Sequence, residues 1–308
     1  MTICIAAICD HSTSPRIVFC ADRLVTDSNG LTYEQGMPKI IQLAKNCIIM
    51  MAGRGAESDQ IIQKSLDKLR EKDKENEFPK ISEIVEIIKI EHQKLRNDCV
   101  NNEILKPRGL ELGRFYTNIK NFPDWLGIML DNQISSYDFS VNFLVLGFDI
   151  EEENSFIFPR LYKIESIGEE KLLNSIGFGI IGIGDSMSLP EITRETYSPK
   201  LPLSEALVRV YWAKKSAERI VSVGDVTTDI GLMEVVNDNG KLNVVINLVD
   251  DSTKKTLLED SYQDYIKKIK TATTSIQTNI DKILNPDTTK TLDMGQSNQP
   301  QPPINPNI

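Results

Sequence analysis

The first fifty residues contain apolar runs that leave no strand face free for water. Residues 2–9, 16–21 and 47–52 carry apolar side chains at consecutive positions rather than at every second position. A strand that faces solvent on one side alternates apolar and polar residues, whereas a strand covered on both sides reads as continuous apolar sequence. These runs therefore predict strands of a sheet that packs on a second sheet on one face and on helices on the other.

The rest of the chain alternates between helical and strand patterns. After a break at Gly53-Arg54-Gly55, we expect helices to about residue 70 and over 81–99, and then a loop over 105–140 with some helix at 125–130. Further expected elements are strands at 141–148, 160–164, 177–182, 229–236 and 241–249, and helices at 204–221 and 257–284. We expect Ser204 to be the N-cap of the helix at 204–221. This order predicts an α+β protein in which two antiparallel sheets stack face to face with helices outside both.

We predict one domain over residues 1–285, with its core at 2–250 and a C-terminal helix at 257–284. From residue 286 the sequence is polar and rich in Pro, Gln and Asn, including the stretch QPQPPINP. Such a composition cannot bury enough apolar surface to order a chain. Residues 286–308 are therefore expected to form a disordered tail.

Composition excludes several classes of function. A net charge of −9 repels phosphate backbones, so nucleic-acid binding is not expected. The apolar runs fall far short of the ~18 residues of a membrane span, and the N-terminus lacks a basic signal-type segment, which predicts a cytoplasmic protein. The five cysteines lie mostly in apolar runs without a C-x-x-C pair, as buried reduced thiols do. We expect no metal and no cofactor.

Histidine chemistry is also disfavoured. The chain has two histidines, His11 in a polar turn and His92 in a charged helix, and neither has a triad or metal partner nearby in sequence. If the protein is an enzyme, we expect its general base to be another group.

Thr2 offers such a group. If Met1 is removed, Thr2 carries a free α-amine and a hydroxyl on the same residue, and the amine can take the proton as the hydroxyl attacks a carbonyl. The alternative is a threonine that simply begins a strand, which its branched side chain suits. Position 2 alone leaves both readings open.

Three further features follow Thr2 in order: Asp22 directly after the second strand, Lys39 before an apolar strand, and Ala52-Gly53 at a strand-to-helix break. This set resembles the N-terminal-threonine (Ntn) hydrolases, specifically proteasome β subunits and the peptidase subunit of the bacterial ATP-dependent protease. In that family a mature N-terminal Thr starts the first strand, an acidic residue follows the second, and a Lys and an Ala-Gly come next. The resemblance implies the four-layer αββα sandwich of the Ntn-hydrolase fold.

Later motifs extend the resemblance over roughly residues 2–250. They are a hairpin formed by 143–149 and 159–164, a glycine-rich turn at 182–184, and a turn at 222–225. The family usually has a serine between the two glycines of the first turn, where this chain has Ile183. Asp185 and Ser186 follow closely and are expected to supply the missing polar group, with Asp225 as a further supporting candidate. The region 71–140 is longer than in the family core.

The resemblance implies a role for each residue. Thr2 Oγ would attack a peptide carbonyl to form an acyl-enzyme, with its own α-amine, of ordinary pKa about 7.7–8.0, as general base. Lys39, held charged by Asp22, would favour the unprotonated amine and the developing alkoxide. The backbone N–H of Gly53 would donate to the oxyanion. The alternatives are a surface ion pair between Asp22 and Lys39 and a glycine that serves only its turn.

The predicted function is therefore a threonine-type endopeptidase that cleaves peptides or unfolded proteins. Removal of Met1 alone would expose Thr2, since no propeptide is expected. The resemblance implies a homo-oligomeric ring, with an ATPase unfoldase as a potential partner. Two alternatives stay open: a catalytically silent structural subunit of such an assembly, and an amidohydrolase that acts on a small amide.

Overall fold

The computed structural model describes residues 2–26, 32–34, 39–72, 78–151, 156–219, 227–238, 240–249 and 252–284. The chain separates into two compact units, residues 1–258 and 259–308. The expected tail at 286–308 lies outside the described residues, and so do Asp225 and the turn at 222–225. Everything below concerns the first unit, apart from helix α7 (Ser252–Leu284), which crosses the boundary.

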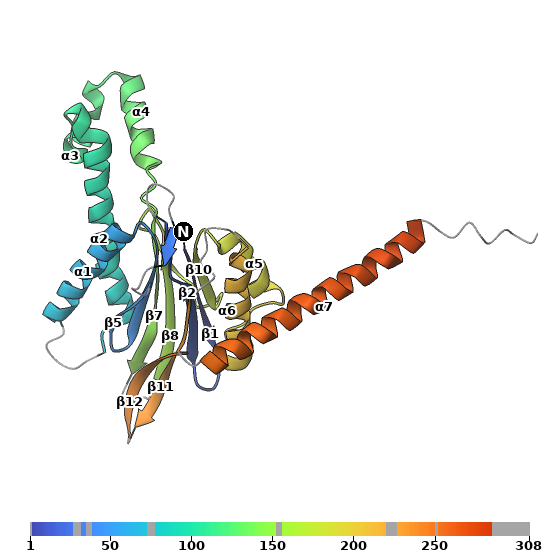
Figure 1. The fold of residues 1–308 in the computed structure, drawn as a ribbon. Helices are drawn as coiled ribbons and strands as arrows, with labels where there is room; N and C mark the ends of the chain where they lie inside the picture. Colours follow the sequence, from blue (N-terminus) through green and yellow to red (C-terminus); the bar gives the residue numbers. More distant parts are fainter. Residues whose placement is uncertain are drawn as a thin grey trace, which may run out of the picture. The chain divides into compact units, whose positions relative to one another are not determined.

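The first unit is an α+β structure built on two five-stranded antiparallel sheets (Figure 1). One sheet has the order β10-β1-β2-β11-β12, made by Phe178–Gly182, Ile3–Cys9, Arg16–Asp22, Thr228–Asp238 and Lys241–Leu248. The other has the order β5-β6-β7-β8-β9, made by Ile40–Ala44, Cys47–Gly53, Val141–Glu151, Phe156–Ile164 and Glu170–Leu172. A small ribbon of β3 (Leu24–Thr26) and β4 (Thr32–Glu34) stands apart. The antiparallel class agrees with the sequence prediction.

The continuous apolar strands are covered on both faces. All seven residues of β1 are buried, and Cys4, Ala6 and Ile8 face the other sheet in a shared core with Met50 and Leu144. The opposite face of β1 packs under α6 (Leu203–Ala217), beside α5 (Asp185–Thr193). On the second sheet, α1 (Gly55–Lys72) and α2 (Ile81–Val100) cover the outer face through a separate apolar cluster.

Residues 101–135, here called the helical arm, are mostly helical, whereas the sequence interpretation expected helix only at 125–130. A π-turn at Asn101–Leu105, short 3₁₀ turns at Lys106–Arg108 and Ile119–Asn121, and helices α3 (Leu112–Asn118) and α4 (Asp124–Ser135) replace the expected loop. The pieces are short and interrupted by Pro107, Gly109 and Pro123, so no helical period runs long enough to be read.

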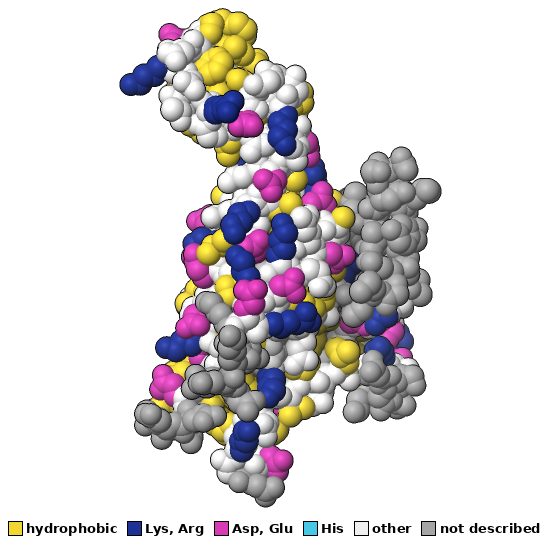
Figure 2. All heavy atoms as spheres, turned by 90° about the vertical axis from the view of Figure 1, so that its left-hand side faces the viewer, with side chains coloured by type: hydrophobic (Ala, Val, Ile, Leu, Met, Phe, Trp, Pro, Cys, Tyr) yellow, Lys and Arg dark blue, Asp and Glu magenta, His cyan; other side chains and the backbone are white. Residues whose placement is uncertain are grey.

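The arm has a small apolar core, formed by Leu105, Phe115, Leu130 and Ile134 together with Val100, the last residue of α2. In Figure 1 helices α3 and α4 extend beyond the end of the sheets. Figure 2 shows hydrophobic side chains gathered at the far end of the arm, whose exposed residues include Trp125 and Ile128.

One predicted helix start was wrong. Ser204 does not cap α6: the helix begins at Leu203, the extended Pro202 occupies the position before it, and no side chain caps the end. Ser204 therefore lies inside the first turn. Among the described residues, no helix combines the length and the apolar character needed to cross a bilayer.

Candidate active site

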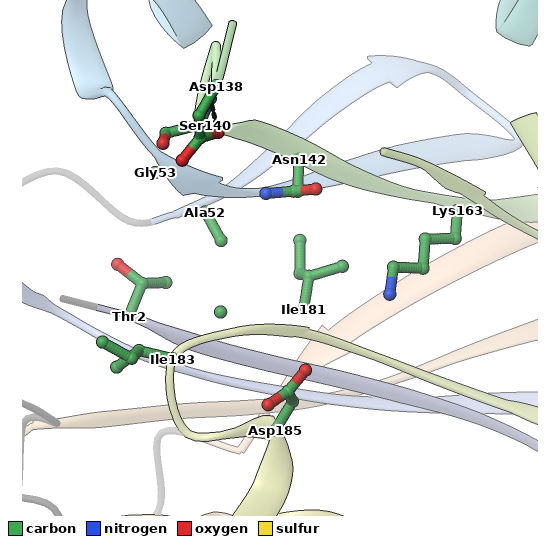
Figure 3. Close-up of a pocket in the computed structure, with 11 residues that line it drawn as sticks. Thr2, Ala52, Gly53, Asp138, Ser140, Asn142, Lys163, Ile181, Ile183 and Asp185 are labelled. Carbon is green, nitrogen blue, oxygen red and sulfur yellow. Dashed lines mark hydrogen bonds between the residues drawn. The ribbon is translucent and has the colours of Figure 1, made fainter. Parts of the chain in front are cut away.

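A pocket of about 410 Å³ opens where the ends of the two sheets meet (Figure 3). Its walls come from both sheets and from the turn between β10 and α5. They are formed by Thr2, Ala52, Gly53, Asp138, Ser140, Asn142, Lys163, Ile181, Gly182, Ile183 and Asp185. The topology thus brings five separate segments of the sequence to one place.

Thr2 lies at this pocket, immediately before β1, and is only 7% exposed. Figure 3 shows its side chain directed into the cavity, on the side of Gly53 and Ser140. Its position is set by the first ladder of the sheet, since Ile3 pairs with Gly182 in the register of β1 and β10.

Asp22 and Lys39 form a buried ion pair beside the first peptide bond of this strand. Lys39 Nζ lies 2.9 Å from Asp22 Oδ1, and the Asp22 and Lys39 side chains are 0% and 5% exposed. The same Oδ1 accepts the backbone N–H of Ile3 at 2.9 Å. The carboxylate is therefore hydrogen-bonded both to the lysine and to the amide that joins Thr2 to Ile3, and the alternative of a surface ion pair is wrong.

Lys39 is fixed by two further contacts. Its Nζ donates to the carbonyl oxygen of Leu24 at 2.5 Å, and its own carbonyl oxygen accepts the N–H of Met51 at 3.1 Å. The first contact ties the lysine to the start of β3, and the second ties it to β6, the strand that ends at Gly53. Neither Asp22 nor Lys39 lines the pocket wall, so both stand behind Thr2 rather than in the cavity.

Two glycines form equivalent corners on opposite sides of the pocket. Gly53 ends β6 and Gly182 ends β10, and both have a φ of +109°. A Cβ atom on Gly53 would lie 1.7 Å from the carbonyl oxygen of Ser140, and one on Gly182 would lie 1.9 Å from that of Thr2. Each corner therefore requires glycine for its backbone angle and for its close approach to the neighbouring strand.

The ladder also orients the Gly53 amide. Arg54 N–H donates to Ser140 O at 3.0 Å, and Gly53 stands opposite Val141 in the β6–β7 register. Because hydrogen-bonded and non-hydrogen-bonded pairs alternate in an antiparallel ladder, Gly53 occupies a non-hydrogen-bonded pair. Its N–H consequently points away from β7.

Asp138, Ser140, Asn142 and Lys163 line the pocket but were not found by sequence reasoning. Ser140 has a φ of +52°, and its N–H donates to Asp138 Oδ1 at 2.8 Å. Asn142 and Lys163 belong to β7 and β8, but these strands also contain Asp149, Glu151 and Arg160, so a polar residue within a strand did not single them out. Ser140 gave no signal either, because it lies in the region interpreted as a loop.

The structure places the three supporting candidates in different locations. Asp185 lines the pocket at the start of α5, whereas Ser186 lines a neighbouring apolar pocket instead. Asp225 lies outside the described residues. Ile183 faces the Thr2 pocket and is 49% exposed, so an apolar side chain occupies this part of the wall.

The cysteines near Thr2 are held as thiols. Burial raises the pKa of the Cys20 thiol to about 12 and also raises the pKa of the Cys4 thiol, which donates to Met51 O at 3.3 Å. A thiol is a poor nucleophile unless it ionises, so these side chains act as small core residues. In the ranges that the structure describes, no group of three His, Cys, Asp or Glu side chains is arranged to hold a metal ion.

Comparisons with known proteins identify the fold. No family model matches the sequence, and no curated protein sequence matches it. Among solved structures, the chain is similar to the Anbu (Gly-1) mutant from Hyphomicrobium sp. strain MC1, with 15% identity and a TM-score of 0.57 over 90% of this chain and 100% of that one. It is also similar to Anbu (ancestral beta-subunit) from Yersinia bercovieri, with 16% identity and a TM-score of 0.57 over 87% and 96% of the two chains.

At this level of identity the likeness shows a proteasome-like fold and nothing finer. It also corrects the sequence interpretation. The assignment to proteasome β subunits of the Ntn-hydrolase family and to the peptidase subunit of the ATP-dependent protease was wrong, because the structural likeness is to Anbu proteins. The short motifs mark strand ends and turns, and different proteins built on one such scaffold share these features.

Proposed function

We propose that this protein hydrolyses peptide bonds with Thr2 as its nucleophile, after removal of Met1. The observation that carries the proposal is the hydrogen-bonded group behind Thr2, in which one buried carboxylate oxygen contacts both Lys39 Nζ and the amide of Ile3. This group lies beside a cavity large enough for a substrate side chain and backbone, with Thr2 in its wall.

The proposed reaction has two steps. Thr2 Oγ attacks the carbonyl carbon and the α-amine of Thr2 accepts the hydroxyl proton, which gives a tetrahedral oxyanion. The oxyanion collapses, the C–N bond breaks, and the ammonium returns its proton to the departing amine. Water then attacks the ester in the same way and releases the acid, which restores the hydroxyl and the amine.

Charged and polar neighbours have separate roles in this proposal. Lys39 lowers the cost of the negative charge that develops on Oγ, and Asp22 holds Lys39 in position. The N–H of Gly53, which points away from β7, donates to the oxyanion. Asp185 is the supporting residue that contacts the pocket, while Ser186 and Asp225 are retained as weaker candidates for this support.

The finer architecture and the assembly are also proposed. The packing of α1 and α2 on one sheet and of α6 on the other supports a four-layer αββα sandwich. A single domain over residues 1–285 stays a prediction. A homo-oligomeric ring is supported by the likeness to a protein described as a beta-subunit. An ATPase unfoldase as partner and a cytoplasmic location stay predictions.

A catalytically silent subunit is the second candidate, and Ile183 is the observation that favours it. An exposed apolar side chain occupies the wall of the pocket at the position where the family described in the sequence analysis usually has a serine. An amidohydrolase specific for small amides is the third candidate. It differs from the first in that lengthening the substrate would not accelerate its reaction.

The proposed chemistry is tested through the mature N-terminus. Intact mass should show loss of Met1, and a peptide epoxyketone, which reacts with both the α-amine and the Oγ of an N-terminal Thr, should add to the wild type once. Thr2→Ala should abolish labelling, and Thr2→Ser should retain it. Retention of Met1, or labelling that survives in Thr2→Ala, would overturn the proposal.

A further inference from the structure

A second pocket adjoins the Thr2 pocket along strand β10. It has a volume of about 350 Å³, and its apolar wall is formed by Leu173, Ile176, Phe178, Ile180 and Leu189. Lys163 and Asp185 line both cavities, so the two share a boundary made of these side chains. Figure 3 shows both side chains facing the interior of the Thr2 pocket.

Two residues of this apolar wall are exposed, whereas Ile180 is buried. Ile176 is 50% exposed and Leu189 is 47% exposed, although both are large apolar residues. Scattered exposed side chains need no explanation, but apolar residues that converge on a concavity beside a reactive group mark a binding site.

Strand β10 connects the two cavities and offers an edge to a substrate. It forms one edge of its sheet, and among the described residues β1 is the only strand that pairs with it. An edge strand presents free N–H and C=O groups that pair readily with an extended peptide. Gly182 lies at the Thr2 pocket, while Phe178 and Ile180 lie at the apolar pocket.

The length of β10 sets the distance between the Thr2 pocket and the apolar pocket. A strand rises about 3.3 Å per residue, so the backbone from Gly182 to Phe178 spans about 13 Å. An extended peptide that runs along this edge advances at the same rate. A side chain in the apolar pocket would therefore belong to a residue two to four positions from the bond attacked by Thr2.

We propose that the substrate is an extended, unfolded peptide that pairs with the outer edge of β10 and places a large apolar side chain in this second pocket. The inference rests on the proposed function of Thr2. It narrows the substrate class to peptides with Leu, Ile, Phe or Met two to four residues from the cleaved bond. It also predicts that a small amide is a poor substrate, since a small amide could not span both cavities.

The test uses the full-length protein and a mixture of unstructured peptides, with cleavage sites identified by mass spectrometry. The wild type should show apolar residues enriched at one position two to four residues from the cut. Leu189→Asp should lower kcat/KM for those peptides about tenfold or more, as expected for loss of an apolar subsite. Leu189→Met should retain the preference.

Met187→Asp is the matched control. Met187 lies on the same helix, has a similar exposure of 46%, and does not line the pocket. It should leave the cleavage pattern unchanged. Equal effects of Met187→Asp and Leu189→Asp on the pattern would overturn the inference.

Backbone pairing is tested separately with peptides N-methylated at successive residues. Because groups that face an edge strand alternate along a peptide, methylation should impair cleavage strongly at every second position and weakly between. A uniform effect would overturn pairing with β10.

Two outcomes separate this inference from the function on which it rests. No epoxyketone labelling of wild-type Thr2 would overturn the proposed function and this inference together. Normal labelling without an apolar preference would overturn this inference alone. Dissociation of an oligomer by Leu189→Asp, with the cleavage pattern preserved, would identify the pocket as a contact between subunits and would also overturn it.

Discussion

Lys39 donates a hydrogen bond from Nζ to Oδ1 of Asp22 across 2.9 Å, and both side chains are almost completely withdrawn from water. The pair joins the end of β2 to the start of β5, and thereby links the two sheets behind Thr2. Its arrangement leads to the first prediction.

Asp22→Asn should destabilise the protein by about 3 kcal/mol or more, because it leaves the buried Lys39 ammonium without its counter-charge. Urea unfolding at neutral pH measures this change. Asp67→Asn is the control, since Asp67 and Arg70 form an exposed pair, and it should alter stability by less than about 0.5 kcal/mol. The double variant Asp22→Asn/Lys39→Met should lose less free energy of unfolding than the two single variants lose together. A cost below about 1 kcal/mol for Asp22→Asn would contradict the prediction.

Gly53→Ala should be strongly destabilising. Its Cβ would overlap the carbonyl oxygen of Ser140 at a φ of +109°, so strand β7 must move or the corner must change. We expect a loss of more than about 2 kcal/mol, against about 1 kcal/mol for Gly109→Ala. Gly109 also has a positive φ, but its Cβ would meet no described atom within 4 Å. Thermal unfolding of both variants provides the comparison, and equal losses would show that the backbone angle alone matters.

The sequence predicted the strands of both sheets except β9, because most of their apolar runs are long, whereas β9 has three residues of which one is apolar. It also singled out Thr2, Asp22, Lys39 and Gly53, which lie at strand ends that the turns make visible. It missed Ser140 and Lys163, because their place at the pocket depends on how the second sheet stacks on the first, and no local pattern encodes that stacking. Of the helical arm it predicted only the helix at 125–130, because the other helices are too short to show a period.

His92 should make stability depend on pH below neutrality. Its Nε2 donates to Val141 O at 3.0 Å, while Nδ1 is buried and has no hydrogen-bond partner among the described residues. Burial, the largest cause, lowers the pKa of His92 from its ordinary value of 6.5. The unfolded chain then binds a proton more readily than the folded protein, so the stabilisation is present above about pH 6.5 and is lost as the pH falls.

We expect the loss to reach at most about 1.4 kcal/mol per pH unit, the limit for one proton. His92→Gln should flatten the dependence between pH 7 and pH 5, as measured by urea midpoints. Exposed His11→Gln is the matched replacement and should keep the wild-type profile. An unchanged profile in His92→Gln would assign the dependence to other groups.

The helical arm should unfold without the sheets. Phe115 is fully buried in the small core of the arm and contacts Tyr116 and Phe122 edge-on or tilted. Phe115→Ala should lower the stabilising free energy of the arm by about 3–5 kcal/mol. We expect so small a core to unfold after a loss of this size. Hydrogen exchange should then accelerate over residues 101–135 and stay slow in β1, β6 and β7. Trp125→Ala, at a position that is 68% exposed, is the control and should leave exchange unchanged. Faster exchange throughout the sheets would show that the arm and the sheets fold as one.

The two glycine corners place the pocket at the boundary between the two sheets. Thr2 and Gly182 belong to one sheet, while Gly53 and Asn142 belong to the other, so any occupant touches both layers at once. An acyl group on Thr2 that also contacts Asn142 would therefore add contacts between the two sheets, which otherwise meet through apolar packing. The acylated protein should unfold at a higher temperature than the free protein. The unfolding temperature would therefore report how much of the cavity the bound group occupies.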